Sequence, residues 1–283
     1  MGTSPQTPRS WRRRLVRLGL CLLVPYGVIT LLLVALENWL LFPGTPASAH
    51  WQESPSAQIQ DVELTTADGT RLHGWWLPRD GAKGAVLYCH GNGGNLSHRG
   101  SALLDWSREL GESVFIFDYP GYGKSEGSPN EANCYAAGEA AYDWLVHAQH
   151  IPAERIILFG KSLGGGVATE LALHRPHRAL VLVKAFTSAP DVAQRHYFWL
   201  PVQWLMRNRF ENLAKIGKCP RPVFLAHGTA DGLIPCTHSE RLFAAAREPK
   251  SFLRLEGDDH NSPLGPEFFA GLRRFLADKA SGN

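Results

Sequence analysis

A serine between two glycines is the first residue whose surroundings suggest chemistry. The segment Gly160-Lys161-Ser162-Leu163-Gly164 follows the short apolar run 156–159 and precedes apolar residues at helical spacing. This pattern predicts a buried strand, a sharp turn and a helix, with glycines where other side chains would clash. The turn would hold the Ser162 hydroxyl at the edge of the sheet, as a nucleophile requires. The competing interpretation is an ordinary glycine turn with a capping serine.

Two further residues complete a set that could activate this hydroxyl. Asp231 follows the apolar run 223–227, and His260 follows the run 252–255. The carboxyl ends of parallel strands share one edge of a sheet, so both side chains are expected near Ser162. His260 would take the serine proton, and Asp231 would fix the tautomer and orientation of the histidine ring. The chain order Ser, Asp, His is one of the known orders of such a triad.

Each of these assignments has a competitor. Asp231 precedes Gly232 and could simply form a turn, and Asp191 is the second candidate for the acid. A histidine in a loop is most often a surface residue, and this chain has 12 histidines. His90 and His227 precede glycines in tight turns, so we interpret them as structural.

A glycine-rich loop offers a second part of the chemistry. His90-Gly91-Asn92-Gly93-Gly94 follows the apolar run 85–89. Two preorganised N–H groups stabilise the oxyanion of an acyl-transfer reaction. The predicted donors are the backbone N–H of Asn92 and that of Leu163, directly after the serine. An ordinary glycine loop is the alternative, and a phosphate loop is excluded because no Gly-Lys-Ser/Thr follows.

Alternating strands and helices would position these loops. A hairpin is predicted over 58–77, followed by strands near 85–90, 114–118, 156–159, 180–183, 223–227 and 252–255 with helices between them. The order predicts an α/β fold, a mostly parallel central sheet flanked by helices, over residues 58–281. The irregular, aromatic stretch 186–216 is predicted as a small helical cap insert. Its aromatic residues would line an acyl pocket, dip toward a bilayer or, for most of them, simply pack on the domain.

These motifs together resemble the α/β-hydrolase family from about residue 59 to 278. The resemblance rests on the segments 90–94, 118–125 (Asp-Tyr-Pro-Gly-Tyr-Gly-Lys-Ser), 160–165, 227–231 and 259–261. It is closest to the branch with a single N-terminal membrane anchor, which includes acyl-protein thioesterases and lipid esterases. Two positions depart from the family pattern: Asp259 stands before the histidine where glycine is frequent, and Gly232 stands where a bulkier residue is commoner.

The resemblance implies a serine hydrolase that needs no cofactor. It places the nucleophile on Ser162, the acid on Asp231, the base on His260 and the oxyanion donors on Asn92 and Leu163. The implied activity is cleavage of carboxylic ester or thioester bonds through an acyl-enzyme, with a small-molecule or lipid acyl ester as substrate. The alternatives are a peptidase-type hydrolase on the same fold and a non-catalytic binding or scaffold protein.

The N-terminus predicts a membrane anchor. Residues 18–36 contain no charged side chain, close to the length of about 20 residues that a spanning helix needs. Arginines precede this run and aromatic residues follow it within 39–42, so the positive-inside rule puts the N-terminus in the cytoplasm. We therefore predict a cytoplasmic basic arm and anchor over 1–42, membrane contact through 18–42, and a linker over 43–57. The catalytic domain would lie on the non-cytoplasmic side, in a periplasm or lumen.

Three other interpretations of this segment compete. A cleaved signal peptide could end near Ala47-Ser48-Ala49, but the apolar run exceeds the usual 7–15 residues. A lipoprotein site at Cys21 is poor because bulky Leu20 precedes it. A buried core helix fits least, given the arginine flank. We favour the uncleaved signal anchor.

Composition excludes several functions. Apolar residues make up 44% and charged residues 19% of the 283-residue chain, which is typical of a folded protein. The net charge is +3, and five arginines before residue 18 supply +5, so the rest is slightly acidic and no nucleic-acid partner is expected. Five cysteines without a Cys-x-x-Cys pattern predict no metal site. Cys219 and Cys236 are a weak candidate for a disulfide, and Cys89 is expected to be a buried apolar residue.

Overall fold

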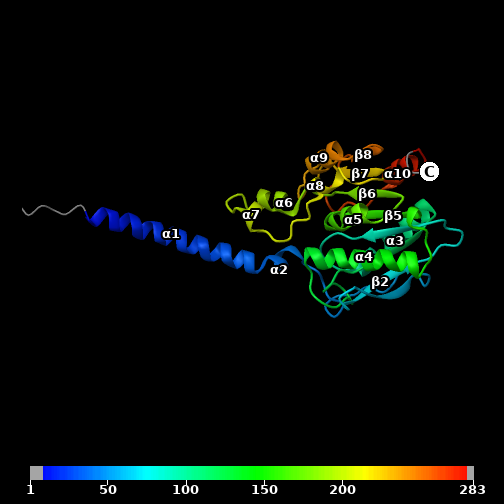
Figure 1. The fold of residues 1–283 in the computed structure, drawn as a ribbon, viewed down its shortest axis with the longest axis horizontal. Coiled ribbons are helices and arrows are strands. Elements are labelled where there is room, and N and C mark those ends of the chain that lie inside the picture. Colours follow the sequence, from blue (N-terminus) through cyan, green and yellow to red (C-terminus); the bar gives the residue numbers. More distant parts are fainter. Residues whose placement is uncertain (1–8, 279–283) are drawn as a thin grey trace, which may run out of the picture.

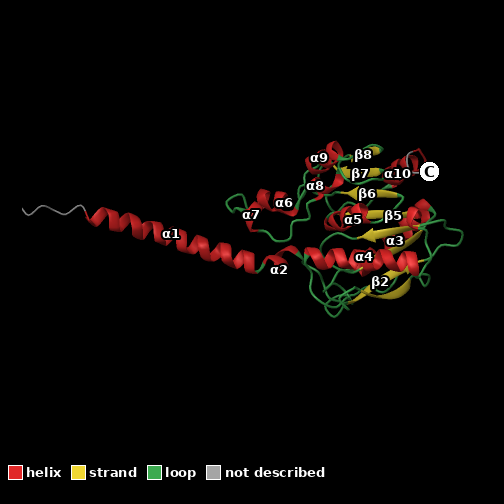
Figure 2. Ribbon diagram, viewed as in Figure 1, coloured by secondary structure: helices red, strands yellow, loops and turns green. Residues whose placement is uncertain are grey.

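The computed structural model describes residues 9–278 and has an eight-stranded sheet. Figure 2 shows this sheet at the centre of the domain, with helices around it. Its spatial order is β1-β2-β4-β3-β5-β6-β7-β8. Strand β2 runs antiparallel to its two neighbours, and all other neighbours are parallel, as predicted. The strands are β1 Gln60–Thr65, β2 Arg71–Leu77, β3 Ala85–Cys89, β4 Ser113–Phe117, β5 Ile156–Lys161, β6 Ala179–Val183, β7 Val223–Gly228 and β8 Lys250–Leu255.

Helices cover both faces of this sheet because its central strands are apolar on both sides. In β3, Leu87 and Cys89 join one core cluster, whereas Val86 and Tyr88 join the other. The first cluster lies under α4 Glu131–His147, α5 Leu163–His174, α8 Asn212–Ile216 and α9 Thr237–Ala245. The second lies under α3 Gly100–Leu110 and α10 Pro266–Asp278. The helix predicted between the strands near 85–90 and 114–118 begins as a 3₁₀ turn, Leu96–Arg99.

The predicted cap insert forms three short helices beside the sheet. They are α6 Ala189–His196, α7 Val202–Leu205 and α8 Asn212–Ile216. Phe210 is fully buried, but Phe198 and Trp204 are 79% and 87% exposed. Tyr197 and Trp199 are also 40% and 43% exposed, so the expectation that most cap aromatics pack on the domain is wrong, because residues 197–204 extend beyond the core that could bury them.

The N-terminal segment forms a long helix, α1 Arg9–Ala35, which projects away from the domain (Figure 1). The most apolar 18-residue window within Arg13–Ala35 has a mean hydropathy of 2.4, and none of that window is buried in the protein. By length and composition these residues can cross a membrane or act as a signal sequence. Residues 1–8 of the predicted arm and residues 279–281 of the predicted domain lie outside the described part of the chain.

The junction after α1 is fixed by a buried carboxylate. Glu37 opens the short helix α2 Glu37–Leu41 and is 7% exposed. Its oxygens accept the backbone N–H groups of Arg207 and Asn208 at 2.8–3.1 Å, together with the side chains of both residues. The start of α2 is thereby attached to the cap.

Replacing Glu37 with glutamine is expected to destabilise this junction. An amide NH₂ group would face the N–H donors of Arg207 and Asn208, and a mismatched buried group costs about 1–3 kcal/mol. Thermal unfolding of the full chain in detergent should show a lower Tm for Glu37→Gln. The matched control, Glu53→Gln at an exposed site, should leave the Tm unchanged. Equal Tm values for both variants would contradict a structural role for the carboxylate.

Residues 43–57, predicted as a linker, lie against the domain. Gly44 forms a β-bridge with Gly94, and the Asn95 side chain donates to the carbonyls of Thr45 and His50 at 3.0 and 2.8 Å. The Pro-, Ser- and Ala-rich composition predicts a linker between membrane and domain, but the β-bridge and the Asn95 hydrogen bonds fasten the segment to the glycine-rich loop.

The suggested pairing of Cys219 with Cys236 is not formed, and all five cysteines are free. Cys219 is turned into the core, where its thiol lies 3.6 Å from the Arg221 carbonyl. Cys89 is fully buried in β3, as predicted.

Candidate active site

A strained turn places Ser162 between β5 and α5. The serine has φ 52° and ψ −118°, a backbone conformation that residues other than glycine rarely adopt. Its N–H donates to the Val183 carbonyl at 3.0 Å, which ties the turn to β6. A Cβ atom on Gly160 would overlap the Gly164 carbonyl, and one on Gly164 would overlap the Cys89 carbonyl. Both flanking positions therefore require glycine.

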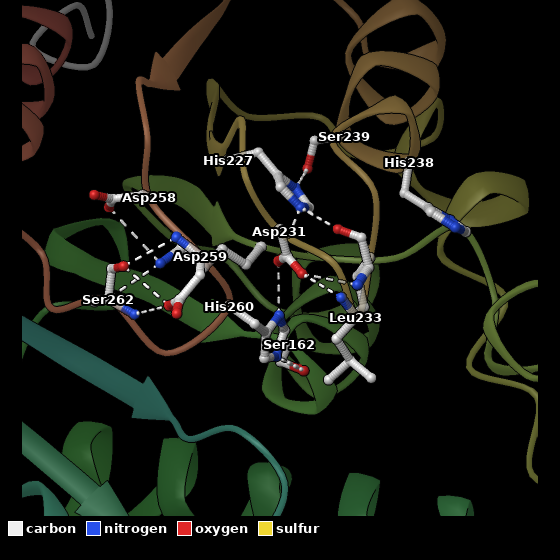
Figure 3. Close-up of polar contacts among 12 residues, drawn as sticks. Ser162, His227, Asp231, Leu233, His238, Ser239, Asp258, Asp259, His260 and Ser262 are labelled. Atoms are coloured by element: carbon white, nitrogen blue, oxygen red, sulfur yellow. Dashed lines mark hydrogen bonds and ion pairs between the residues drawn. The ribbon is translucent and has the colours of Figure 1, made fainter. Parts of the chain in front are cut away.

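The structure brings Ser162, His260 and Asp231 together from three strand ends (Figure 3). His260 Nε2 lies 3.1 Å from Ser162 Oγ, and His260 Nδ1 lies 2.7 Å from Asp231 Oδ2. The serine and aspartate are each 7% exposed. This hydrogen-bonded chain can pass the hydroxyl proton to the ring while the carboxylate holds the ring in place.

Asp231 is itself held by several donors. Its Oδ1 accepts the N–H groups of Leu233 and Ile234 at 3.0 and 2.8 Å. His227 Nε2 lies 3.3 Å from Oδ2 and 2.8 Å from the Ile234 carbonyl, so this nitrogen carries the proton, and the Ser239 hydroxyl donates to Nδ1. The sequence predicts a structural role for His227 but does not reveal its contact with the acid. Its place four residues before Asp231, at the end of β7, is the signal that could have revealed it.

These contacts set the ionisation of Asp231. Burial alone would raise the pKa of the carboxyl, but hydrogen bonds from His227, His260 and the Ile234 N–H outweigh it and hold the pKa far below the usual value. Asp231 is therefore ionised at neutral pH.

The depressed pKa of Asp231 predicts how stability changes with acid. The folded state releases the Asp231 proton more readily than the unfolded state. The carboxylate therefore stabilises the fold fully above about pH 3.9, the ordinary pKa of an aspartate. This stabilisation is lost as the pH falls from there through the lower pKa of the folded state. Urea unfolding in detergent should show wild type more stable than Asp231→Asn at pH 6, with a smaller difference at pH 3. A difference independent of pH would contradict the shift.

The two predicted oxyanion donors lie beside the serine. A Cβ atom on Gly91 would stand only 3.6 Å from Ser162 Cβ, so the loop before Asn92 packs directly against the turn. The Asn92 side-chain NH₂ group donates to the Leu41 carbonyl, and its Oδ1 accepts the Tyr122 hydroxyl. Among the described residues, neither the Asn92 N–H nor the Leu163 N–H has an acceptor in the protein. Leu163 opens α5, whose first N–H groups have no intrahelical partner.

The second candidate acid and two other polar residues that the sequence singles out have partners of their own. Asp191, the second candidate for the acid, accepts the Thr187 hydroxyl at 2.6 Å and the Gln203 amide at 3.0 Å, away from His260. Asp259 caps its own loop by accepting the N–H groups of Asn261 and Ser262. His90 is fully buried, with Nε2 3.4 Å from an Asp118 oxygen, in agreement with a structural role.

A cleft of about 470 Å³ opens beside Ser162 and His260. One part of its lining is apolar, from Trp106, Leu264 and Phe269, and another is charged, from Arg99, Asp105 and Lys161. Burial, with the neighbouring charges of Lys184 and Arg99, lowers the pKa of the Lys161 ammonium to about 8. Within residues 9–278, no group of three or more His, Cys, Asp or Glu side chains is arranged to hold a metal.

Comparisons with known proteins agree with this architecture. The family model of the alpha/beta hydrolase fold matches residues 84–215. An uncharacterised Mycobacterium tuberculosis protein is 38% identical over 274 residues, 95% of this chain and 96% of its own. YfhR of Salmonella typhi is 34% identical over 72% of this chain and 75% of its own. The Pyrococcus furiosus esterase Pf2001 superposes with a TM-score of 0.65 at 19% identity, covering 81% of this chain and 99% of its own. The chain belongs to the α/β-hydrolase family.

Proposed function

We propose that this protein is a membrane-anchored serine hydrolase that cleaves carboxylic ester or thioester bonds. The observation that carries the proposal is the series of hydrogen bonds from Asp231 through His260 to Ser162, beside two N–H groups that have no acceptor in the described part of the chain. The esterase fold of Pf2001 supports the same reaction class.

In this mechanism Ser162 Oγ attacks the acyl carbonyl while His260 Nε2 takes the hydroxyl proton. The carbonyl oxygen becomes an oxyanion that accepts the N–H groups of Asn92 and Leu163. Collapse expels the leaving group, which takes the proton from His260, and an ester between the acyl group and Ser162 remains. Water then attacks that ester, with His260 as base, and releases the acid. Asp231 stabilises the imidazolium formed in each step.

Turnover of small esters tests the proposal. Short-chain p-nitrophenyl esters and the matching thioesters should be hydrolysed by the full chain in detergent, with an initial burst of about one p-nitrophenol per enzyme if deacylation is slower. Peptide amide substrates under the same conditions distinguish a peptidase. Binding of these compounds without turnover would instead indicate a non-catalytic protein and contradict the proposal.

We further propose that α1 is an uncleaved anchor with the arginine-rich end in the cytoplasm and the hydrolase domain on the other side. Cells expressing the chain should retain the full-length protein in membranes after a carbonate wash and release it only with detergent. A soluble product that starts near His50 would show cleavage and contradict the anchor.

A further inference from the structure

The tip of the cap lies beside the middle of α1. The Tyr26 ring is 6.1 Å from the Trp199 ring, and the Tyr26 hydroxyl donates to the Trp199 carbonyl at 3.2 Å. Tyr26 belongs to the candidate span and precedes its end, Ala35, by nine residues, or about 13 Å along a helix. Figure 1 shows α1 leaving the domain on the side where α6 and α7 lie.

The side chains of this tip are unusually apolar for a surface. Phe198, Trp199 and Trp204 are 79%, 43% and 87% exposed, and Trp39 in α2 is 75% exposed. An apolar pocket of about 150 Å³ separates the cap from the anchor. Its lining includes Leu33, Leu40 and Leu41 from α1 and α2, and Tyr197, Leu200 and Met206 from the cap. Exposed apolar patches of this kind mark contact surfaces.

The backbone carbonyls of the tip already have hydrogen-bond partners within the protein. The Gln194 side chain donates to the carbonyls of Phe198 and Leu200 at 3.2 and 3.4 Å, and Tyr26 serves the carbonyl of Trp199. The carbonyl of Tyr197 accepts the Leu200 N–H at 2.9 Å. Four consecutive carbonyls therefore have hydrogen-bond partners within the protein. Such partners are needed in the hydrocarbon of a bilayer, whereas in water the solvent could supply them.

We infer that the cap tip, residues 197–204, is embedded in the lipid bilayer beside α1. If α1 crosses a hydrocarbon core about 30 Å thick, side chains that touch it at Tyr26 lie within that core too. The domain is then held at the membrane by two elements, the span and the cap. This inference rests on the proposed anchor and not on the chemistry at Ser162.

Spin labelling of the full chain in nanodiscs tests the depth of the tip. The accessible cysteines are replaced (Cys21→Ser, Cys236→Ser), and a nitroxide is attached through Phe198→Cys or, as the control, Asp80→Cys at the opposite edge of the sheet. Oxygen concentrates in lipid, whereas a nickel chelate stays in water. For each label we compare the collision rate with oxygen to the collision rate with the chelate. This ratio should be at least about tenfold higher for the label at 198 than for the label at 80.

Equal accessibility of both labels to the chelate would overturn the inference. The intact mass of the labelled protein shows whether α1 is retained, and loss of α1 would overturn it as well. Neither measurement depends on turnover, so a failure here is distinct from a failure of the hydrolase proposal.

A second inference comes from the charged wall of the cleft. Lys161 directly precedes the serine, and its stem packs near Gly91, where a Cβ atom would stand 3.9 Å from Lys161 Cγ. Among residues 9–278, no hydrogen bond or ion pair reaches its ammonium group. Arg99 also lines the cleft and donates one hydrogen bond, to the Gly93 carbonyl at 3.1 Å.

The opposing charge in the cleft is already engaged. Asp105, the carboxylate among the described lining residues, accepts Arg108 at 2.8 Å. A partly buried cation without an acceptor is costly, and a negatively charged ligand would relieve that cost. We propose that the cleft takes acyl esters that carry a carboxylate or phosphate, held by Lys161 and Arg99. This names the substrate class of the proposed hydrolase and rests on that function.

Matched ester pairs test this preference. In each pair an anionic ester is compared with a neutral analogue: a dicarboxylic mono-p-nitrophenyl ester with its methyl ester, a carboxyphenyl acetate with its methyl ester, and a lysophosphatidate with the monoacylglycerol. Wild type should show a kcat/KM at least about tenfold higher for the anionic member of one pair or more. The ratio should fall about tenfold in Lys161→Gln, recover in Lys161→Arg and stay unchanged in the exposed control Lys83→Gln.

The three pairs separate an anion on the acyl group from a carboxylate or phosphate on the leaving group. Ratios near one in every pair, or a ratio that Lys161→Gln leaves unchanged, would overturn this second inference. Esters that wild type hydrolyses no faster than Ser162→Ala would instead refute the hydrolase itself.

Discussion

Ser162→Ala is expected to lower kcat for ester hydrolysis by about 10⁴-fold or more. The substitution removes the attacking oxygen and leaves His260, Asp231 and both N–H donors in place. It also removes the 3.1 Å contact with His260 but no contact that holds the turn, because the backbone bond to Val183 remains. Steady-state kinetics of the purified variant on p-nitrophenyl esters measures the loss.

The control for this prediction is Ser128→Ala, an exposed serine outside the cleft, which should retain full activity. Thermal unfolding of both variants shows that each is folded. Activity of Ser162→Ala within about tenfold of wild type, at an unchanged Tm, would place the chemistry on another residue.

Asp231→Asn is expected to lower kcat by about 10³–10⁴-fold while leaving the fold intact. The amide has no charge to stabilise the imidazolium, and it can favour the wrong ring tautomer through its NH₂ group. His227 Nε2–H, which now lies 3.3 Å from an Asp231 oxygen, would face the same NH₂ in one of its two orientations. Single-turnover kinetics separates the loss in the acylation step from any change in product release.

Asp191→Asn is the matched control, because it changes the competing acid in the same way. Asp191 accepts Thr187 and Gln203 and makes no contact with His260, so this variant should keep kcat within a few fold of wild type. A larger loss in Asp191→Asn than in Asp231→Asn would reverse the assignment of the acid.

The meeting of the three side chains could be predicted because it depends on local pattern and on a general rule of sheets. Ser162 lies between glycines that the turn requires, and Asp231 and His260 each follow an apolar run. Parallel strands place all such positions at one edge. Their proposed roles in catalysis remain predictions that the variants above test.

Contacts between distant segments could not be predicted in the same way. Asn95 donates a hydrogen bond to the Thr45 carbonyl, and Glu37 accepts hydrogen bonds from Arg207 and Asn208. No local sequence pattern relates the residues of these pairs. The sequence therefore indicated a free linker where the structure has a fastened segment. The exposure of Phe198 and Trp204 could not be predicted for a related reason. Apolar composition does not reveal whether a side chain is covered by the protein core or by a surface outside it.

The most direct test of the account is covalent labelling with a fluorophosphonate, followed by mass spectrometry of the labelled peptide. The reagent needs an activated hydroxyl and nearby oxyanion donors, so it tests the chain from Asp231 to Ser162 without knowledge of the substrate. We expect one adduct per chain, on Ser162, and its loss in Ser162→Ala. Adduct formation that persists in Ser162→Ala, or an unlabelled wild type, would contradict it.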